Sequence, residues 1–332
     1  MAKILFLISI VICTEVSYGQ VFRKRETVLM GSRFDITIVA EDSLSAENYI
    51  DQVIGEISRI EELISDWKAT SQVSEINRNA GIRPVKVDRE VFELTQRALF
   101  FSEITDGAFD ISFAAMDKIW RFEGSMEALP DETVIQKAIA KIGYQHIVLD
   151  SAASTVFLKL PGMKIGFGAT GKGYAADKGR ELMQSMNIRA GIVNASGDMA
   201  SWGAQPDGSP WKIGVANPFK RYKITKIISL RKGAVTTSGD YEKYVEINGK
   251  RYSHIINPKT GMPVTGLTSV TVIGENAEMA NGFSTSIMVL GKEKGLRLLR
   301  NYPQYACILI TDSGRIIRSK NYKKVVGKLR SE

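Results

Sequence analysis

Cysteine is scarce in this sequence, at two residues of 332. Cys13 lies in an apolar run near the N-terminus, and Cys307 lies inside the apolar stretch 305–310. If the N-terminal run is removed, Cys307 stands alone in the chain. A lone cysteine among apolar residues is more often a buried core thiol than a redox or metal residue. We therefore expect Cys307 to be packed in the core.

The sequence also lacks internal repeats, low-complexity segments and any linker rich in proline or glycine. Of its residues, 44% are apolar and 24% are charged. A chain of this length and composition can bury the core of one large domain or of two intimately joined ones. We expect a single domain of joined subdomains over residues 20–332, preceded by a removable leader.

A basic face interleaved with aromatic residues is also missing, which argues against a nucleic-acid-binding protein. The formal charge is nevertheless +8, and residues 315–330 contain seven of the lysines and arginines. A solvated basic terminus is the simple interpretation. The alternative is a weak attraction to anionic lipid headgroups, which would suit an enzyme whose targets sit in a membrane.

The first nineteen residues have the pattern of a signal peptide. Lys3 supplies positive charge, residues 4–13 form an apolar run, and residues 17–19 place small side chains where a signal peptidase cuts. The apolar run is too short to span a bilayer comfortably. We therefore expect a signal peptide over residues 1–19, cleavage before Gln20 and export of the mature chain.

Lipidation of Cys13 is an alternative way in which this leader could end. It would leave the exported chain anchored to the membrane. The preceding residues 10–12 are Ile-Val-Ile and lack the small residue that is expected just before a lipidated cysteine. The signal-peptidase interpretation is therefore preferred.

Apolar periodicity predicts a mixture of helices and strands. Asn248-Gly249 stands between two alternating runs and predicts a two-residue hairpin. The elements do not follow a strict strand–helix–strand order, which favours an α+β fold over a doubly wound sheet. We expect helices at 47–64, 89–102, 131–141, 173–187, 278–290 and 292–301, and strands at 34–40, 145–150, 155–160 and 305–311.

The densest chemical signal is the glycine-rich segment 166–177, Gly-Phe-Gly-Ala-Thr-Gly-Lys-Gly-Tyr-Ala-Ala-Asp. Its glycines let a ligand approach the backbone closely. Lys172 follows where a helix is expected to begin, and the backbone N–H groups at a helix start, together with one lysine, form an anion site. The spacing matches neither the P-loop nor the Rossmann fingerprint. Glycines at a turn are also commonly structural.

His254 is one of only two histidines, and it ends a predicted strand just before a turn containing Pro258 and Gly261. A lone histidine is more often structural than catalytic, but a position at a strand end beside a rigid turn favours function. His146 lies within a predicted strand and is interpreted as structural.

Asn281 and Thr285 are four residues apart at the start of a predicted helix, so both side chains lie on one face. Two oxygens so placed suit a hard cation, although such residues are usually helix caps. Three shorter segments complete the set. They are the turn 105–110 (Thr-Asp-Gly-Ala-Phe-Asp), Met-Gly-Ser at 30–32 before the first strand of the mature fold, and Ser-Asp-Trp at 65–67, where an exposed tryptophan could stack on a flat ring.

Taken in this order, from about residue 30 to 291, these segments resemble the ApbE family of FAD:protein FMN transferases. The resemblance implies a T-fold-like α+β architecture with antiparallel sheets and packed helices. It also implies export to the periplasm or the periplasmic face of the inner membrane, bound FAD and a required Mg²⁺. Members move FMN from FAD to a Ser or Thr of a membrane redox-complex subunit, and some hydrolyse FAD to FMN and AMP.

The resemblance assigns roles residue by residue. His254 of the His-Ile signature is the expected catalytic base. The residues expected to contact FAD are Met30, Trp67, Ala108, Phe109, Asp110, Gly166, Lys172, His254 and Ile255. Those expected to hold the metal are Ala169, through its backbone carbonyl, Asn281 and Thr285.

Two positions depart from the family pattern. The family usually has Asp where this chain has Gly166, so one polar contact to FAD is expected to be missing. It also usually has Asp where this chain has Asn281, and an amide brings no negative charge to Mg²⁺. Glu278, one turn earlier, could compensate. These losses leave two alternatives beside the transferase, which are an FAD pyrophosphatase and a non-catalytic exported FAD-binding protein.

Overall fold

The computed structural model describes residues 20–122, 126–220, 223–239 and 243–331 of the chain. The expected signal peptide and Cys13 lie outside these described residues. Within them, no helix has both the length and the apolar character needed to cross a membrane.

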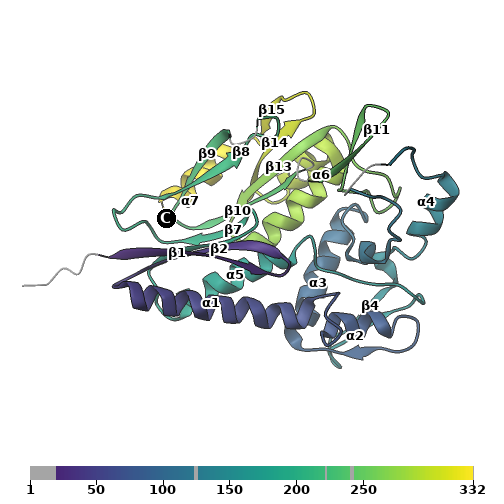
Figure 1. The fold of residues 1–332 in the computed structure, drawn as a ribbon, viewed down its shortest axis with the longest axis horizontal. Coiled ribbons are helices and arrows are strands. Elements are labelled where there is room, and N and C mark those ends of the chain that lie inside the picture. Colours follow the sequence, from purple (N-terminus) through teal and green to yellow (C-terminus); the bar gives the residue numbers. More distant parts are fainter. Residues whose placement is uncertain (1–19, 123–125, 221–222, 240–242, 332) are drawn as a thin grey trace, which may run out of the picture.

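An antiparallel eight-stranded sheet forms the centre of the fold (Figure 1). Its second strand, β2, pairs with β1 on one side and with β6 on the other. Every residue of β13 is buried, which requires that both faces of the sheet be covered at that strand. In spatial order the strands are β1 (Val21–Leu29), β2 (Ser32–Ala40), β6 (Ala190–Ala195), β7 (Asp198–Trp202), β10 (Gly233–Gly239), β13 (Leu267–Gly274), β14 (Ala306–Thr311) and β15 (Ile316–Arg318).

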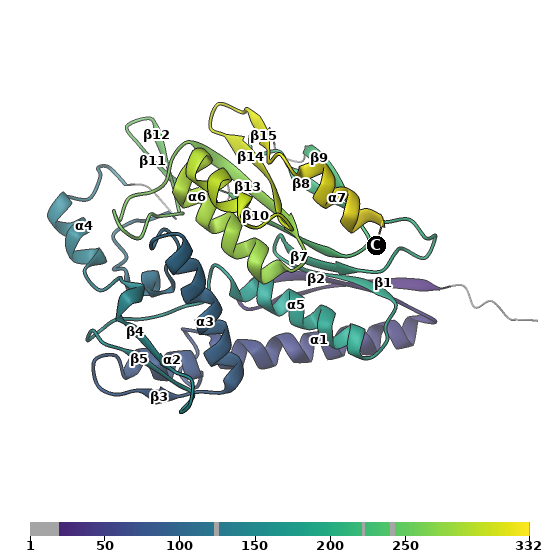
Figure 2. The same ribbon diagram turned by 180° about the vertical axis from the view of Figure 1, so that it is seen from behind.

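Three helices cover one face of this sheet: α1 (Ser43–Ile64), α5 (Gly171–Ser185) and α6 (Ala277–Arg300). The opposite face is covered over part of its width by the hairpin β8–β9 (Trp211–Ala216, Ile224–Leu230) and by α7 (Tyr322–Ser331) (Figure 2). Neighbouring residues of β13 point to opposite faces of the sheet. Val272 packs into the main core, and Ile273 packs under α7. This alternation is the period of two expected for a strand covered on both sides.

The remaining elements lie beyond one end of the sheet, around α3 (Arg89–Ile104). They include α2 (Gln72–Arg78), α4 (Glu132–Ile139) and a small sheet ordered β3 (Val85–Lys86), β5 (Thr155–Leu158), β4 (Ile147–Asp150). A separate hairpin joins β11 (Tyr244–Ile247) to β12 (Lys250–Ser253). Two 3-10 turns, Ile111–Ala115 and Tyr144–His146, complete this part.

Most of the predicted elements are present. The α+β class is confirmed, as is the hairpin at Asn248-Gly249, where both φ angles are positive (51° and 73°). The helices predicted at 278–290 and 292–301 are the two halves of α6, which is kinked at Gly291 (φ 74°, ψ 175°). Cys307 is buried in the main core, as expected.

Two expectations are wrong. Met30 does not precede the first strand, because β1 lies before it and Met30-Gly31 is the tight turn that joins β1 to β2 (φ 51° and 65°). His146 is not within a strand but in a 3-10 turn. Hydrogen bonds from the backbone N–H groups of Gly143 and Tyr144 to Ser112 and Asp110 hold that turn.

The basic C-terminal segment forms an element that the sequence analysis did not predict. Tyr322, Val325 and Leu329 of α7 are buried against the sheet, while Lys323 and Lys324 are exposed. The apolar side chains are three and four residues apart, so one face of the helix is buried and the lysines occupy the other.

Candidate functional site

A cavity of about 400 Å³ lies where the first turns of α5 and α6 meet the turn after α3 and the segment after β12. Its volume is in the range of small-molecule and cofactor sites. Ten of the residues singled out from the sequence line it: Ala108, Phe109, Asp110, Gly166, Ala169, Lys172, His254, Ile255, Asn281 and Thr285. Residues separated by up to 177 positions therefore share one cavity.

Met30 and Trp67 are not among the residues that line this cavity. Trp67 is 66% exposed and lies near the Met30-Gly31 turn, with its Cζ2 atom 4.0 Å from the position of a Cβ atom on Gly31. The two predicted contacts to FAD at these residues stay predictions.

The positive charge in the cavity comes from Lys172. Helix α5 begins at Gly171, so Lys172 lies in its first turn, as the glycine-rich segment predicted. Its Nζ atom is 3.3 Å from Oδ2 of Asp198, whose side chain is only 3% exposed. Lysine and the N-terminal turn of a helix together favour a bound anion.

Asp198 is a cavity residue that the sequence analysis missed. It begins β7 directly after the turn Ser196-Gly197, where both φ angles are positive (54° and 99°). The Ser196-Gly197 pair before it is a turn signal in the sequence, but nothing in the sequence showed that Asp198 faces Lys172.

Asn281 provides the clearest sign of a cation site. It is 5% exposed, and its Oδ1 atom is buried without a hydrogen-bond partner among the described residues. Thr285, one turn later, lines the same cavity and lies 3.4 Å from Ser238 through their hydroxyl oxygens. A buried unsatisfied oxygen costs about 1–3 kcal/mol, which a bound ion or water would relieve.

The donors around Asn281 fit Mg²⁺ better than a transition metal. Asn281 offers an amide oxygen and Thr285 a hydroxyl, and Ala169 lines the same cavity. Across the part of the chain that the structure describes, no three His, Cys, Asp or Glu side chains gather in a way that could hold a metal. Hard cations prefer oxygen ligands of this kind, whereas zinc prefers nitrogen and sulfur.

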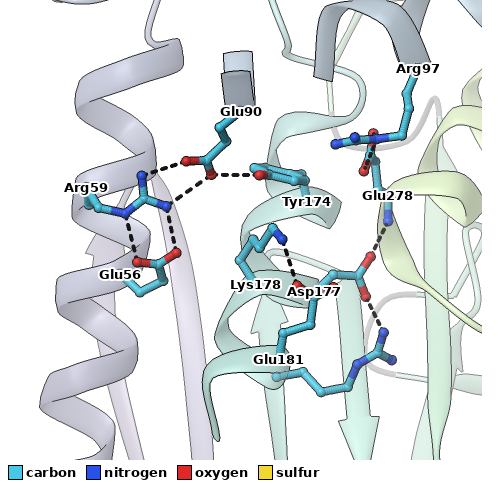
Figure 3. A network of polar contacts seen from close by, with 10 residues as sticks. Glu56, Arg59, Glu90, Arg97, Tyr174, Asp177, Lys178, Glu181 and Glu278 are labelled. Carbon is cyan, nitrogen blue, oxygen red and sulfur yellow. Dashed lines mark hydrogen bonds and ion pairs between the residues drawn. The ribbon is translucent and has the colours of Figure 1, made fainter. Parts of the chain in front are cut away.

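Glu278 does not compensate for the neutral amide of Asn281. Its side chain is buried outside the cavity, and Nε of Arg97 on α3 donates to both of its carboxylate oxygens, at 2.7 and 2.9 Å (Figure 3). Burial raises the pKa of Glu278, although the Arg97 guanidinium acts in the opposite direction. The carboxylate is therefore committed to joining α6 to α3.

Asp177 joins the two helices that carry the anion and cation sites. Its Oδ2 accepts hydrogen bonds from the backbone N–H groups of Ala277 and Glu278 at 2.7 and 2.8 Å, and its Oδ1 accepts one from Arg180 at 2.8 Å. Figure 3 shows the hydrogen bond between Asp177 and Glu278. The helices are in close contact, because a Cβ atom on Gly173 would lie 2.5 Å from the carbonyl oxygen of Ala277. This contact sets the spacing between Lys172 and Asn281.

His254 lines the cavity with one ring nitrogen already engaged. Its Nδ1 lies 3.0 Å from the backbone carbonyl oxygen of Lys243. A carbonyl only accepts hydrogen bonds, so Nδ1 carries the proton in this contact, and in that tautomer the lone pair is on Nε2. The ring also meets Phe122 edge to face, at 6.4 Å between centroids. The position suits a general base.

Asp110 has a structural role in the cavity wall. One of its carboxylate oxygens accepts hydrogen bonds from the backbone N–H and hydroxyl of Ser112, and the other accepts one from the backbone N–H of Tyr144. Burial raises the pKa of Asp110, against the effect of these hydrogen bonds. The carboxylate therefore shapes the turn that presents Ala108 and Phe109 to the cavity.

Comparison with known proteins agrees with this geometry. The model of the ApbE family matches residues 30–309. The chain belongs to the ApbE family. It is 34% identical to an FAD:protein FMN transferase of Klebsiella pneumoniae over 294 residues, which cover 88% of this chain and 90% of that protein. It is 31% identical to the FAD:protein FMN transferase of Treponema pallidum over 282 residues, which cover 80% of this chain and 78% of the relative.

Solved ApbE structures share the fold. The ApbE protein of Thermotoga maritima superposes with a TM-score of 0.83 at 30% identity, covering 94% of this chain and all 100% of its own. The apo form of the flavinyl transferase ApbE of Pseudomonas stutzeri gives a TM-score of 0.81 at 29% identity, covering 93% and 98%. The chain is thus an ApbE-family flavinyltransferase, an activity that implies FAD as a substrate and a protein as the acceptor.

Proposed function

We propose that this ApbE-family protein uses Mg²⁺ to cleave FAD and attaches FMN through a phosphoester to a Ser or Thr of another protein, releasing AMP. The proposal is supported by one cavity that brings together Lys172, the oxygens of Asn281 and Thr285, and His254. These are a phosphate-binding cation, a hard-cation site and a base, which are the groups that phosphoryl transfer requires.

The residues divide the reaction between them. Lys172 neutralises a phosphate oxygen of FAD, while Asn281, Thr285 and the backbone of Ala169 hold Mg²⁺. When bound, the ion supplies charge stabilisation at the pyrophosphate. His254 accepts the proton through Nε2 as the acceptor hydroxyl forms a bond to the phosphorus of FMN. The bond from that phosphorus to the oxygen of AMP breaks, and AMP leaves.

The test is to incubate the purified mature protein with FAD, Mg²⁺ and an acceptor domain. The acceptor carries the segment Asp-Gly-x-(Ser/Thr)-(Gly/Ala)-(Ala/Thr)-Thr, as expected for a subunit of a membrane redox complex. Mass spectrometry should show the acceptor gaining the mass of FMN, and chromatography should show AMP. FMN and AMP free in solution would instead identify a pyrophosphatase. FAD that is bound but unchanged would identify a binding protein.

We also propose that the protein acts after export, at the periplasmic face of the inner membrane. The signal-peptide pattern of residues 1–19 and the exposed lysines of α7 support this placement. Fractionation of cells should recover the protein with the periplasm, or with the membrane if Cys13 is lipidated. Binding of the mature protein to anionic vesicles should weaken as salt is raised, because exposed charges are screened.

A further inference from the structure

Gly166 lies in the wall of the cavity, where a side chain could be added only if a neighbouring group shifted by a few tenths of an ångström. A Cβ atom on Gly166 would lie 3.1 Å from Cβ of Ala114 and 3.1 Å from Oδ2 of Asp66. The backbone at Gly166 is not in the left-handed region, so its conformation alone would admit another residue. By contrast, a Cβ atom on Gly168, two positions later in the same wall, would have no atom within 4 Å beyond those of its own chain neighbours. The restriction at position 166 therefore comes from its two neighbours, the methyl group of Ala114 and the carboxylate of Asp66.

Asp66 is held in the cavity by the backbone around it. Helix α1 ends at Ile64, and the buried residue Ser65 is fixed by hydrogen bonds from the hydroxyls of Ser71 and Ser74 to its carbonyl oxygen. The hydroxyl of Ser65 accepts a further hydrogen bond from the backbone N–H of Lys68, at 3.2 Å. The residue that follows Ser65 thus has a defined direction, and Asp66 lines the cavity.

The carboxylate of Asp66 is not used within the fold. Across the described residues it takes part in no hydrogen bond or ion pair. The adjacent cation, Lys68, pairs instead with Glu62 at 2.6 Å and Glu61 at 3.7 Å. The cavity therefore contains a carboxylate whose oxygens can accept hydrogen bonds from a ligand. Its charge is opposite to that of Lys172, which lines the same cavity.

We propose that Asp66 is a substrate-binding residue that accepts a hydrogen bond from an N–H or O–H group of FAD. This inference rests on the proposed function, since it takes FAD as the ligand. The carboxylate repels phosphates, so its partner lies on a ring or sugar of FAD, while Lys172 attracts the pyrophosphate. The polar contact expected to be missing at Gly166 is thus supplied from Asp66, and the glycine makes room for it. Asp66 and Lys172 together also orient the dinucleotide in the cavity.

Exchange of the two residues tests this assignment. FAD binding is measured by the change in flavin fluorescence, without Mg²⁺, for the mature protein and its variants. Asp66→Ala should weaken FAD binding by about tenfold or more, since a hydrogen bond to a charged group contributes about 1.5–3 kcal/mol. Asp312→Ala, which removes an exposed carboxylate in the turn between β14 and β15, should leave binding unchanged. Asp66→Asn keeps one acceptor oxygen and should lose less.

Gly166→Asp should also weaken FAD binding and lower the melting temperature, because it forces a second carboxylate against Asp66. The double variant Asp66→Ala/Gly166→Asp restores a single carboxylate at the same place and should recover most of the lost affinity. Wild-type affinity in Asp66→Ala, or a double variant no better than either single one, would overturn the proposal. Because Asp66 is exposed and unpaired within the described residues, its removal should not unfold the protein.

The transfer assay separates this inference from the proposed function. If the wild type binds FAD and modifies the acceptor while Asp66→Ala does both equally well, the role of Asp66 is refuted and the transferase stands. If Asp66→Ala loses binding but the wild type never modifies an acceptor, Asp66 is a binding residue of a protein that is not a transferase. A wild type that does not bind FAD would refute both.

Discussion

His254 is the residue on which the proposed chemistry depends most directly. Its Nδ1 contacts the carbonyl of Lys243, so in the proposed mechanism the proton is accepted at Nε2. We predict that His254→Ala lowers FMN transfer by about 10²–10⁴-fold, the usual contribution of general base catalysis, with little change in FAD binding. The measurement is single-turnover labelling of the acceptor beside an FAD titration. Transfer at the wild-type rate would remove His254 from the mechanism.

In the proposed metal site, Asn281 offers a neutral amide oxygen, and its Oδ1 is buried without a hydrogen-bond partner among the described residues. We predict that Asn281→Asp lowers the Mg²⁺ concentration needed for half-maximal turnover, since a carboxylate adds charge to the site. The control is Asn301→Asp, at the exposed end of the same helix, which should leave the Mg²⁺ dependence unchanged. An unchanged dependence in Asn281→Asp would place the metal elsewhere.

At the scale of elements, the contact between α5 and α6 determines the shape of the site. Asp177 receives two backbone N–H groups from the first turn of α6, so its substitution acts on the position of Asn281. We predict that Asp177→Asn lowers the free energy of unfolding by about 2–4 kcal/mol, because an amide has one acceptor oxygen and leaves a backbone N–H or Arg180 without its partner. It should also raise the Mg²⁺ requirement, which a change in stability alone would not do.

The control for Asp177→Asn lies in the neighbouring network of Figure 3. Glu90 accepts hydrogen bonds from Arg59 on α1 and Tyr174 on α5, and neither of these two partners lies on α6. Glu90→Gln should therefore lower stability without altering the Mg²⁺ requirement. Equal Mg²⁺ curves for wild type and Asp177→Asn would show that the α5–α6 contact does not position the metal site.

The pH dependence of stability provides a second readout for Asp177. Burial raises its pKa above the ordinary value of 3.8, so the folded state binds this proton more tightly than the unfolded state does. The contribution of this group to stability is then lost as pH rises from the unfolded pKa through the folded one. In denaturant titrations at a series of pH values, the free energy of unfolding of Asp177→Asn should decline less steeply over that pH range than that of the wild type.

For the whole molecule, FAD and Mg²⁺ should stabilise the fold together. A ligand that binds only the folded state adds about 2.7 kcal/mol at 100 times its dissociation constant. We predict that FAD alone raises the melting temperature, and that Mg²⁺ adds to this increase when FAD is present. Thermal unfolding of Asn281→Ala should retain the effect of FAD and lose the increment from Mg²⁺. An unaltered increment in this variant would argue against Asn281 as a ligand.

Sequence reasoning succeeded where a signal is local. The amphipathic periods of α1 and α3, the Asn248-Gly249 turn and the helix start at Lys172 all follow from residues close together in the chain. It failed for β1, whose side chains are mostly exposed or partly so, and for α7, whose charges concealed three buried apolar residues. Secondary-structure propensity and hydrophobic periodicity do not reveal which elements become neighbours in the fold.

The same limit applies to the site. His254 and Asn281 could be identified from short motifs. Asp198 carries no such motif, and in the segment 65–67 only the tryptophan, not Asp66, was given a role. Asp66 became a candidate only because the fold places it against Gly166, one hundred positions later. The sequence analysis considered Glu278 as a possible compensating charge because it could not show that the partner of Glu278 is Arg97, which lies 181 positions earlier.

The order of the cavity residues along the chain determines when the complete cavity can form. Its walls run from Asp66 to Val289, with the metal site carried by the late helix α6. A nascent or partly translocated chain that has emerged only as far as α5 possesses Lys172 but neither His254 nor Asn281. The complete cavity therefore forms only after nearly the whole polypeptide has emerged. On the proposed function, a chain threaded unfolded across a membrane would take up FAD on the far side.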